Sequence, residues 1–480
     1  MKARVWSGNG AQEMREGVGW RTEGSRPAGG CPGRSGLKTG SVRSGGVGKL
    51  FTVALVLAVL EGAVRKWLLG MESGYGGYLA YFSKDAFFCA VLVFGRGARV
   101  SGPMRLFRGW LIAGTLLFVV GGAVSVAYGF NWVGACLTMR AVVLLPWVAL
   151  LASERLGGYP VRKAALILGG LTVVNAGLSA VQNRFPAEHI LNRYSTGETE
   201  VVALETGVRA TGTYSYITGL AVMSSVGVWG GLVLVSVAGG DRRVQAAGTV
   251  SIASGFGCAL ASVSRGPLVV GFVMVGLWCV LGRPKGRGSV GALLVMGCLV
   301  LLGAWAAGAF PSLARLANAV VERHESSEET VWDRTFSQVA EGAKAVRQLP
   351  LGGGLGTEQV AANYARTQTR SFTTYENQFP RLIVESGVIG FLGFIVICIG
   401  GLLALESAKR CAGDPCLRAA LTATQLLLIP LFYGNAVFNH TGSAFAWMIF
   451  AIALAQIRTP PGPNNKSSAR RRHRSRSSAH

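Results

Sequence analysis

One polar stretch, from Pro311 to Phe379, carries the side chains best suited to chemistry. It holds seven Lys or Arg and eight Asp or Glu, including the adjacent pair Asp333 and Arg334. It also contains the glycine run PLGGGLGTE (350–358) and the segment YENQF (375–379). A carboxylate can take a proton from a hydroxyl, and a guanidinium can bind a phosphate or another anion. If the protein does chemistry, we expect it in this stretch.

The segments that must position this stretch are long and apolar. Half of the 480 residues are hydrophobic and only 15% are charged, whereas soluble proteins average about 25% charged residues. The mean hydropathy is +0.41. The chain is therefore predicted to be an integral membrane protein, and it contains twelve apolar runs of helical length. These are 50–64, 78–95, 107–127, 133–153, 164–182, 213–237, 245–263, 267–282, 289–310, 380–404, 417–437 and 442–457.

The predicted fold is an all-α polytopic membrane protein of about twelve transmembrane helices with one large, partly helical extracytoplasmic loop. Nine helices fall within 50–310, the loop is 311–379, and three helices fall within 380–457. The flanking tails, 1–49 and 458–480, are basic and rich in Gly, Ser, Pro and Arg, which predicts disorder. They carry more than half of the net charge of +24. A basic tail beside a membrane span typically touches anionic headgroups on the cytoplasmic side, so we expect no nucleic-acid partner.

The charge of the connections predicts the orientation. Counted from the N-terminus, the even connections between the predicted helices are short and basic, whereas the odd ones are charge-poor or long, such as 183–210 and 311–379. By the positive-inside rule, the even connections and both tails are cytoplasmic and the odd connections are outside.

Seven ionisable residues lie within or at the edge of the predicted spans. A charge at the bilayer centre costs ~2.5–3.5 kcal/mol or more, so such residues usually pair or line a wet cavity, and they are candidates for function. The structural alternative is that Glu61 or Asp85 pairs with basic members of the set to hold helices together. For Arg65 and Lys66, snorkelling to the interface beside Trp67 is a further alternative. The set is Glu61, Arg65, Lys66, Asp85, Arg140, Arg265 and Glu385.

Short polar motifs follow one another from about residue 61 to residue 390. They are EGAVRKW (61–67), KD (84–85), QNRFPAEHILN (182–192), RATGTYSYITG (209–219), SRG (264–266), Arg334 upstream of PLGGGLG, and ENQFPRLIVESGVIG (376–390). Their order beside the expected helices resembles the bacterial O-antigen ligase and O-antigen polymerase membrane proteins, which are C-type polyprenyl-dependent glycosyltransferases. The ligases carry a His at the end of the large loop, followed by Asn, Ser or Gln and then by spaced small residues. Asn377, Gly387 and Gly390 fit that spacing, but Glu376 stands at the His position.

The resemblance implies an inverting, metal-independent transfer of a glycan from a polyprenyl-diphosphate donor to an acceptor hydroxyl on the outer face of the bacterial cytoplasmic (inner) membrane. It implies no cofactor, and its partners are the lipid-linked donor, a lipid or glycan acceptor and membrane lipids. Because the leaving diphosphate gains negative charge, guanidinium groups must compensate it. The residues implied as catalytic are Glu376, Arg265 and Arg334, and those implied in substrate binding are Arg209, Arg140, Asn377 and Arg65. For Arg209, Arg265 and Arg334 the alternative is contact with lipid headgroups or an ion pair with an acid of the large loop.

Glu376 is the expected base because it directly precedes a helix that is predicted to start at Pro380. Glu385 lies nine residues further on, about 13 Å along a helix, and is expected to be a structural or orienting residue. His440 is the rival base. The Glu at the family's His position leaves ligase, polymerase or an unassigned relative open. The glycines between 352 and 356 could cradle a phosphate or form a plain turn.

The alternative function is a twelve-helix transporter or lipid-linked sugar flippase. Transporters built from two six-helix halves usually show internal repeats and often a central cytoplasmic linker. The sequence shows no repeat, and its long polar segment lies between the ninth and tenth predicted spans on the predicted outer side. This arrangement favours the enzyme.

Overall fold

The structure is a computed structural model that describes residues 46–69, 75–94, 101–156, 159–193, 203–204, 207–282, 331–358, 378–434 and 440–457. All of these ranges belong to the unit Ser44–His480. The elements are α1 (Gly46–Ala63), η1 (Val64–Leu69), α2 (Tyr75–Phe94), α3 (Gly102–Ser125), α4 (Trp132–Met139), η2 (Arg140–Leu144), α5 (Leu145–Arg155), α6 (Val161–Gln182), η3 (Ile190–Asn192), β1 (Ala203–Leu204), β2 (Gly207–Val208), α7 (Ile217–Val237), α8 (Arg242–Ala261), α9 (Arg265–Leu281), α12 (Val331–Gln348), α14 (Gln378–Cys411), α15 (Pro415–Tyr433) and α16 (His440–Ala455).

The helices confirm the predicted all-helical membrane-protein character. Eleven of the twelve expected segments coincide with a helix, and the other, 289–310, lies outside the described residues. Eight helices in the described ranges are long and apolar enough to cross a bilayer, while α9 and α16 are shorter apolar helices. The number twelve and the topology stay predictions. The only strands in the described ranges, β1 and β2, form an antiparallel pair of two residues each.

Several helices differ from the predicted segments; α3, for example, begins at Gly102 and not at residue 107. Helix α1 begins at Gly46, inside the segment 1–49 that was expected to be tail, and continues as the π-helix η1 to Leu69. The segment 133–153 is interrupted by the π-helix η2. Helix α14 extends beyond 380–404 at both ends. The described part of the loop 311–379 includes α12, so this part is helical as expected.

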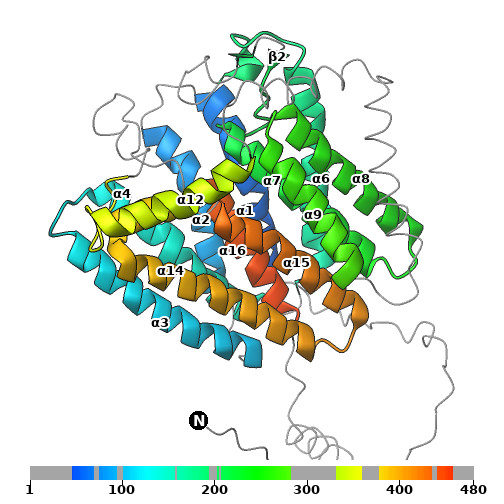
Figure 1. Cartoon of the computed structure of the whole chain (residues 1–480). Helices are drawn as coiled ribbons and strands as arrows, with labels where there is room; N and C mark the ends of the chain where they lie inside the picture. The colour runs from blue at the N-terminus through cyan, green and yellow to red at the C-terminus, as the bar shows by residue number, and fades with distance from the viewer. Residues whose placement is uncertain are drawn as a thin grey trace, which may run out of the picture. The chain divides into compact units, whose positions relative to one another are not determined.

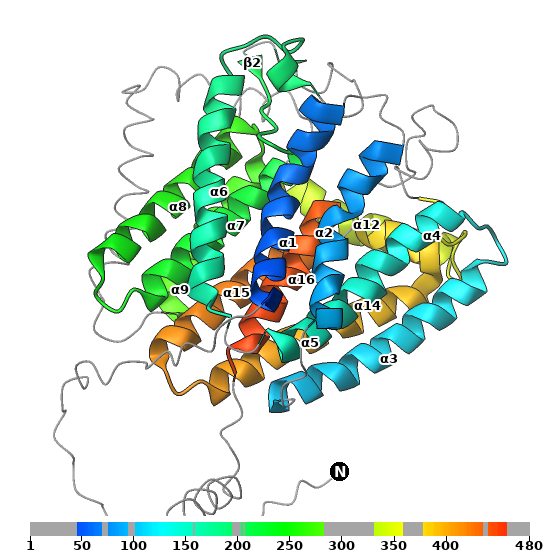
Figure 2. The same cartoon turned by 180° about the vertical axis from the view of Figure 1, so that it is seen from behind.

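Helices α7 and α16 form the interior of the bundle (Figures 1 and 2). Helix α7 is buried along almost its whole length and packs on α6, α8, α9 and α15. In α16, every residue from Ala444 to Ala455 is buried. A helix that is apolar on all sides can be surrounded either by other helices or by lipid, and here both helices are surrounded by other helices.

Among the described helices, α3 and α14 make the most extensive contact with each other. Small residues allow the two backbones to approach each other. A Cβ atom added at Gly121 would collide with the backbone of Gly390, and one added at Gly114 would lie 2.6 Å from the Gly393 carbonyl oxygen. Close backbone approach through small residues is a common way for helices to associate where lipid provides no hydrophobic driving force.

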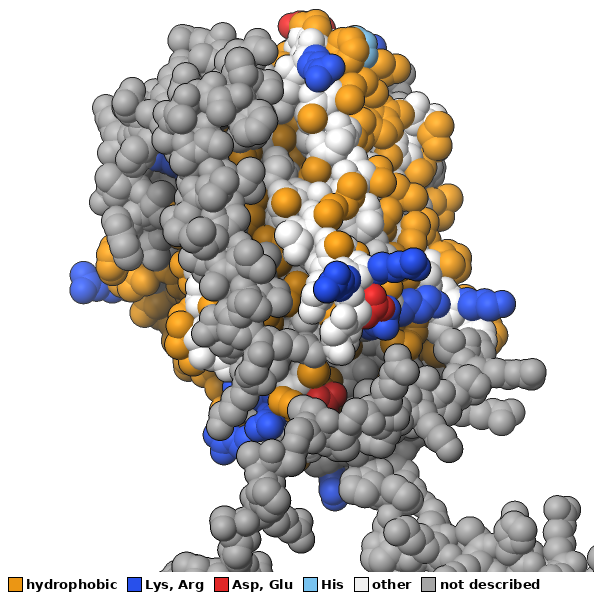
Figure 3. Space-filling view, turned by 90° about the vertical axis from the view of Figure 1, so that its right-hand side faces the viewer, with side chains coloured by type: hydrophobic (Ala, Val, Ile, Leu, Met, Phe, Trp, Pro, Cys, Tyr) orange, Lys and Arg blue, Asp and Glu red, His pale blue; other side chains and the backbone are white. Residues whose placement is uncertain are grey.

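The surface has the pattern expected of a membrane protein. On the face shown in Figure 3, hydrophobic side chains cover most of the described surface, and Lys and Arg side chains gather toward its lower part.

The lower ends of α8 and α15 are capped by Asp241 and Asp414, which accept hydrogen bonds from the first free backbone N–H groups of their helices.

Candidate active site

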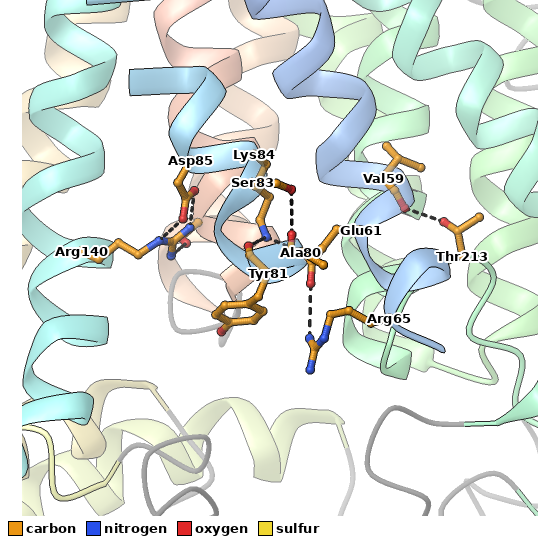
Figure 4. A network of polar contacts seen from close by, with 11 residues as sticks. Val59, Glu61, Arg65, Ala80, Tyr81, Ser83, Lys84, Asp85, Arg140 and Thr213 are labelled. Carbon is orange, nitrogen blue, oxygen red and sulfur yellow. Dashed lines mark hydrogen bonds and ion pairs between the residues drawn. The ribbon is translucent and has the colours of Figure 1, made fainter. Parts of the chain in front are cut away.

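The acid in the first predicted span, Glu61, is buried near the end of α1 and faces two cations (Figure 4). Lys84 Nζ of α2 donates a 2.5 Å hydrogen bond to Glu61 Oε2, and Arg65 Nη1 donates one of 3.3 Å to Oε1. The pairing with Arg65 is one of those that the structural alternative allowed. Lys84 was not among the expected partners, because helix periodicity does not tell which residue of α2 faces α1.

The second acid, Asp85, forms a two-pronged ion pair with Arg140. The Arg140 Nε and Nη2 atoms donate to Asp85 Oδ2 and Oδ1 over 2.6 Å and 2.7 Å, and Nη1 donates to Ser443 Oγ over 3.3 Å. The pair therefore joins α2, η2 and α16. This is the structural role that the sequence left open for Arg140.

Together, Glu61, Arg65, Lys84, Asp85 and Arg140 form a buried ion network. In Figure 4 the Tyr81 ring lies between Arg140 on one side and Arg65 on the other, with its centroid 5.1 Å from Arg65 Cζ and 5.0 Å from Lys84 Nζ. Arg65 lies in η1, and Arg140 is the first residue of η2. Short π-helices are rare and are frequent at functional sites. The network balances its acids with cations on neighbouring helices, as buried charges require.

Arg209 lies against the connection between α8 and α9. Its Nε donates to the Ser262 carbonyl oxygen over 3.3 Å, and the neighbouring Ala210 N–H donates to the Ala261 carbonyl oxygen over 3.0 Å. The connection has only three residues, so Arg265, the first residue of α9, follows at once. Two of the arginines predicted to bind the donor are thus brought to one place, which we call the arginine corner (Arg209, Ser262 and Arg265).

The turn inside the arginine corner is strained. Val263 has φ +50°, and it is the only residue other than glycine with a positive φ in the described ranges. A β-branched residue in this region is a genuine outlier, and such backbone conformations cluster at functional sites. The turn places Ser264 at the N-cap of α9 and Arg265 directly after it.

Three predicted site residues are described only by their position or not at all. Arg334 lies in α12, but the placement of its side chain is outside the described residues. Glu376 and Asn377 also lie outside them, directly before α14, which begins at Gln378. The side chain of the rival base, His440, at the first position of α16, is likewise outside.

The glycine run forms a packed turn that breaks α14. Gly353 N–H donates to the Val384 carbonyl oxygen over 2.6 Å, and Val388 N–H donates to the Pro350 carbonyl oxygen over 2.9 Å. In a regular helix, Val388 N–H would bind Val384 instead. The break occurs at Gly387, which has φ +67° and ψ 179°.

The other end of the glycine run is fixed to the α3–α4 connection. Leu355 N–H donates to Gly129, and Asn131 N–H donates to Leu355. At Gly356, φ is +80° and a Cβ atom would collide with the backbone of Ala135. Because the N–H groups of Gly352, Gly353 and Leu355 are already engaged by backbone carbonyls, the structure favours the plain turn over the phosphate cradle.

Glu385, predicted to be structural or orienting, is fully buried just before this break. Thr138 Oγ1 of α4 donates a 2.5 Å hydrogen bond to Glu385 Oε2, and Arg381 Nε lies 3.8 Å from Oε1. Ser125 Oγ donates to the Glu385 backbone carbonyl over 2.7 Å. The residue therefore connects α14 to α3 and α4, in agreement with the predicted role.

Sequence reasoning singled out Gln182 only as the first residue of a motif and missed the polar stripe on α6 to which it belongs. Asn175, Ser179 and Gln182 are buried and lie three or four residues apart, so they share one face of the helix. Gln182 and Asn175 bind the backbone of residues 211–213. Their spacing inside an apolar segment was the signal that could have revealed them.

Part of the chain matches a known protein family. Residues 250–395 match a family model described as O-antigen ligase. The match runs from α8 into α14 and contains Arg265, Arg334, the glycine run and Glu376. No curated protein matches the chain. In the described ranges there is no group of three or more His, Cys, Asp or Glu that could hold a metal ion.

Proposed function

We propose that this chain, which belongs to the O-antigen ligase and polymerase superfamily, transfers a glycan from a polyprenyl-diphosphate donor to an acceptor hydroxyl on the outer face of the bacterial cytoplasmic membrane. The observation that carries the proposal is the arginine corner, where the Arg209 Nε binds the carbonyl of Ser262 and Arg265 begins α9. The corner lies at the end of the bundle that the connection charges predict to be outside.

In the proposed reaction, the acceptor oxygen attacks the anomeric carbon as the bond from that carbon to the diphosphate oxygen breaks. The bond electrons go to the departing lipid diphosphate, and the hydroxyl proton goes to Glu376. A single displacement inverts the anomeric centre. Arg209, Arg265 and Arg334 bind the diphosphate, since a guanidinium fork stabilises the charge that grows on the leaving group. No metal ion takes part in this scheme.

Three further residues are proposed to contact or support the substrates: Asn377, Arg65 and Arg140. Asn377, next to the base, is proposed to orient the acceptor. Arg65 is 26% exposed although it pairs with Glu61, so part of its guanidinium can face a donor phosphate. Arg140 is proposed to support the donor site through its ion pair with Asp85.

A reconstituted assay tests the function. Purified protein in proteoliposomes, supplied with a polyprenyl-diphosphate glycan and an acceptor, should form a longer or transferred glycan and release the lipid diphosphate, with equal rates in the presence and absence of EDTA. Movement of the donor across the bilayer without a new glycosidic bond would identify a flippase instead. In cells, gene deletion should leave unligated or unpolymerised donor to accumulate.

A further inference from the structure

Lys66 is a buried cation that the proposed chemistry does not use. Its side chain is 4% exposed. The sequence-based alternative that Lys66 snorkels to the membrane interface is therefore wrong. Its Nζ donates to Thr211 Oγ1 over 2.7 Å and to the Gly212 carbonyl oxygen over 2.9 Å. In the described ranges, no carboxylate lies within ion-pair distance of this ammonium group. The bonds of Lys66 go to the segment 211–212.

The segment that Lys66 holds is also held from the opposite helix. Gln182 Oε1 accepts hydrogen bonds from the N–H groups of Thr211 (3.2 Å) and Gly212 (2.8 Å). Asn175 Oδ1 accepts one from Thr213 N–H over 2.9 Å. Gly212 has φ +58°, and a Cβ atom there would collide with Asn175. The segment therefore fits between η1 and α6 in one conformation.

The held segment begins two residues after Arg209. The next backbone contact toward Arg209 is the bond from Ala210 N–H to the Ala261 carbonyl oxygen, followed by the bond from Arg209 Nε to Ser262. A displacement of residues 211–213 would therefore move Arg209 along the α8–α9 connection and away from Arg265.

We infer that Lys66 is a positioning residue, which fixes the segment Thr211–Thr213 and thereby holds the Arg209 guanidinium at the arginine corner. This gives the π-helix η1 a role, because it carries Lys66 to the segment, while its neighbour Arg65 stays on the buried ion network. The inference rests on the proposed function in so far as Arg209 binds the donor diphosphate.

The first experiment measures position without activity. Trypsin cleaves after arginine, and the Arg209–Ala210 bond is held in the wild-type protein by the contacts above. Lys66→Met and the milder Thr211→Val should speed cleavage after Arg209 about tenfold and leave cleavage after Arg193 unchanged. Lys49→Met, an exposed lysine at the other end of the same helix, is the matched control and should cleave as the wild type. Unchanged cleavage after Arg209 in both variants would overturn the inference.

The second experiment uses transfer kinetics on folded, monodisperse protein. Lys66→Met should raise KM for the lipid-linked donor about tenfold with a smaller change in kcat, and Lys66→Arg should recover part of the loss. Combined with Arg209→Lys, Lys66→Met should add little, because both act on one guanidinium. A lower Tm with an unchanged donor KM, or fully additive losses, would show a merely structural lysine. If Arg209→Lys alone retains wild-type transfer, the donor-binding role of Arg209 fails, while the cleavage result still decides the role of Lys66.

Discussion

The buried ion network and the arginine corner both carry arginine in a largely apolar protein, but they hold it differently. In the network, Arg140 meets Asp85 through two hydrogen bonds of 2.6 Å and 2.7 Å, and Glu61 meets two cations. At the corner, Arg209 is held through a neutral backbone carbonyl of a strained turn. An ion pair balances the charge of the guanidinium that it fixes, whereas a backbone carbonyl orients a guanidinium through a dipole. We therefore expect the network to contribute mainly to stability, with Arg65 and Arg140 supporting the donor site from its edge, and the corner to contribute mainly to binding the donor diphosphate.

The largest effect is expected at the proposed base. Glu376→Gln keeps the shape and removes the proton acceptor, so kcat for transfer should fall by about 10²- to 10⁴-fold, with little change in donor binding. Glu376→His restores the residue of the ligases and should retain a measurable part of the activity. Rates are measured with purified lipid-linked donor. A wild-type rate for the Gln variant would move the test to His440.

The next effect concerns the arginines. Arg265→Lys and Arg334→Lys keep the charge but lose the fork of two N–H donors, so transfer should fall by about 10²-fold while the protein still inserts. Arg242→Lys, at the opposite end of α8 from the corner, is the matched control and should keep full activity. Undiminished transfer in both test variants would contradict the proposal that the arginines outside the ion network bind the donor diphosphate.

In the network the expected effect is on stability. Asp85→Asn leaves Arg140 buried without a carboxylate, which should cost about 3–5 kcal/mol of unfolding free energy. Transfer per folded molecule should change far less than for Arg265→Lys. The double variant Asp85→Leu with Arg140→Met should recover much of the stability, since no charge stays buried. Thermal unfolding in detergent measures both, and a large loss of kcat at unchanged Tm would place the network in the reaction.

The last prediction concerns which end of the bundle is outside, and its substitutions are expected to leave activity unchanged. Single cysteines are introduced as Ser327→Cys and Ser475→Cys in a background without the nine native cysteines. In intact spheroplasts an impermeant maleimide should label the first and not the second. The reverse pattern would place the arginine corner on the cytoplasmic side, where an extracytoplasmic donor could not reach it.

Hydropathy and charge predicted the helices well, because each span is specified by its own composition. Pairing across helices was predicted only in part. The sequence anticipated that Glu61 and Asp85 would pair with cations, but not that Lys84 would face Glu61 or that Lys66 would reach Thr211. Those contacts depend on which helices are neighbours. They also depend on the π-helices η1 and η2, which change the direction in which the side chains of these helices point. The role of the glycine run could not be predicted, because it depends on hydrogen bonds to the backbone of α14 and of the α3–α4 connection. Both are distant in sequence from the run.

The break in α14 has a consequence for how the chain is assembled in the membrane. Because Gly387 is not helical, Val388 N–H does not donate to Val384 C=O. The two groups instead form hydrogen bonds with Pro350 C=O and Gly353 N–H, respectively. In hydrocarbon, an unsatisfied backbone group costs several kcal/mol. The ribosome makes α3, α4 and the 350–356 turn before α14, so the partners of the broken helix are already present when it enters the bilayer. A circular permutant that made α14 first would have to insert it as an unbroken helix and bend it later.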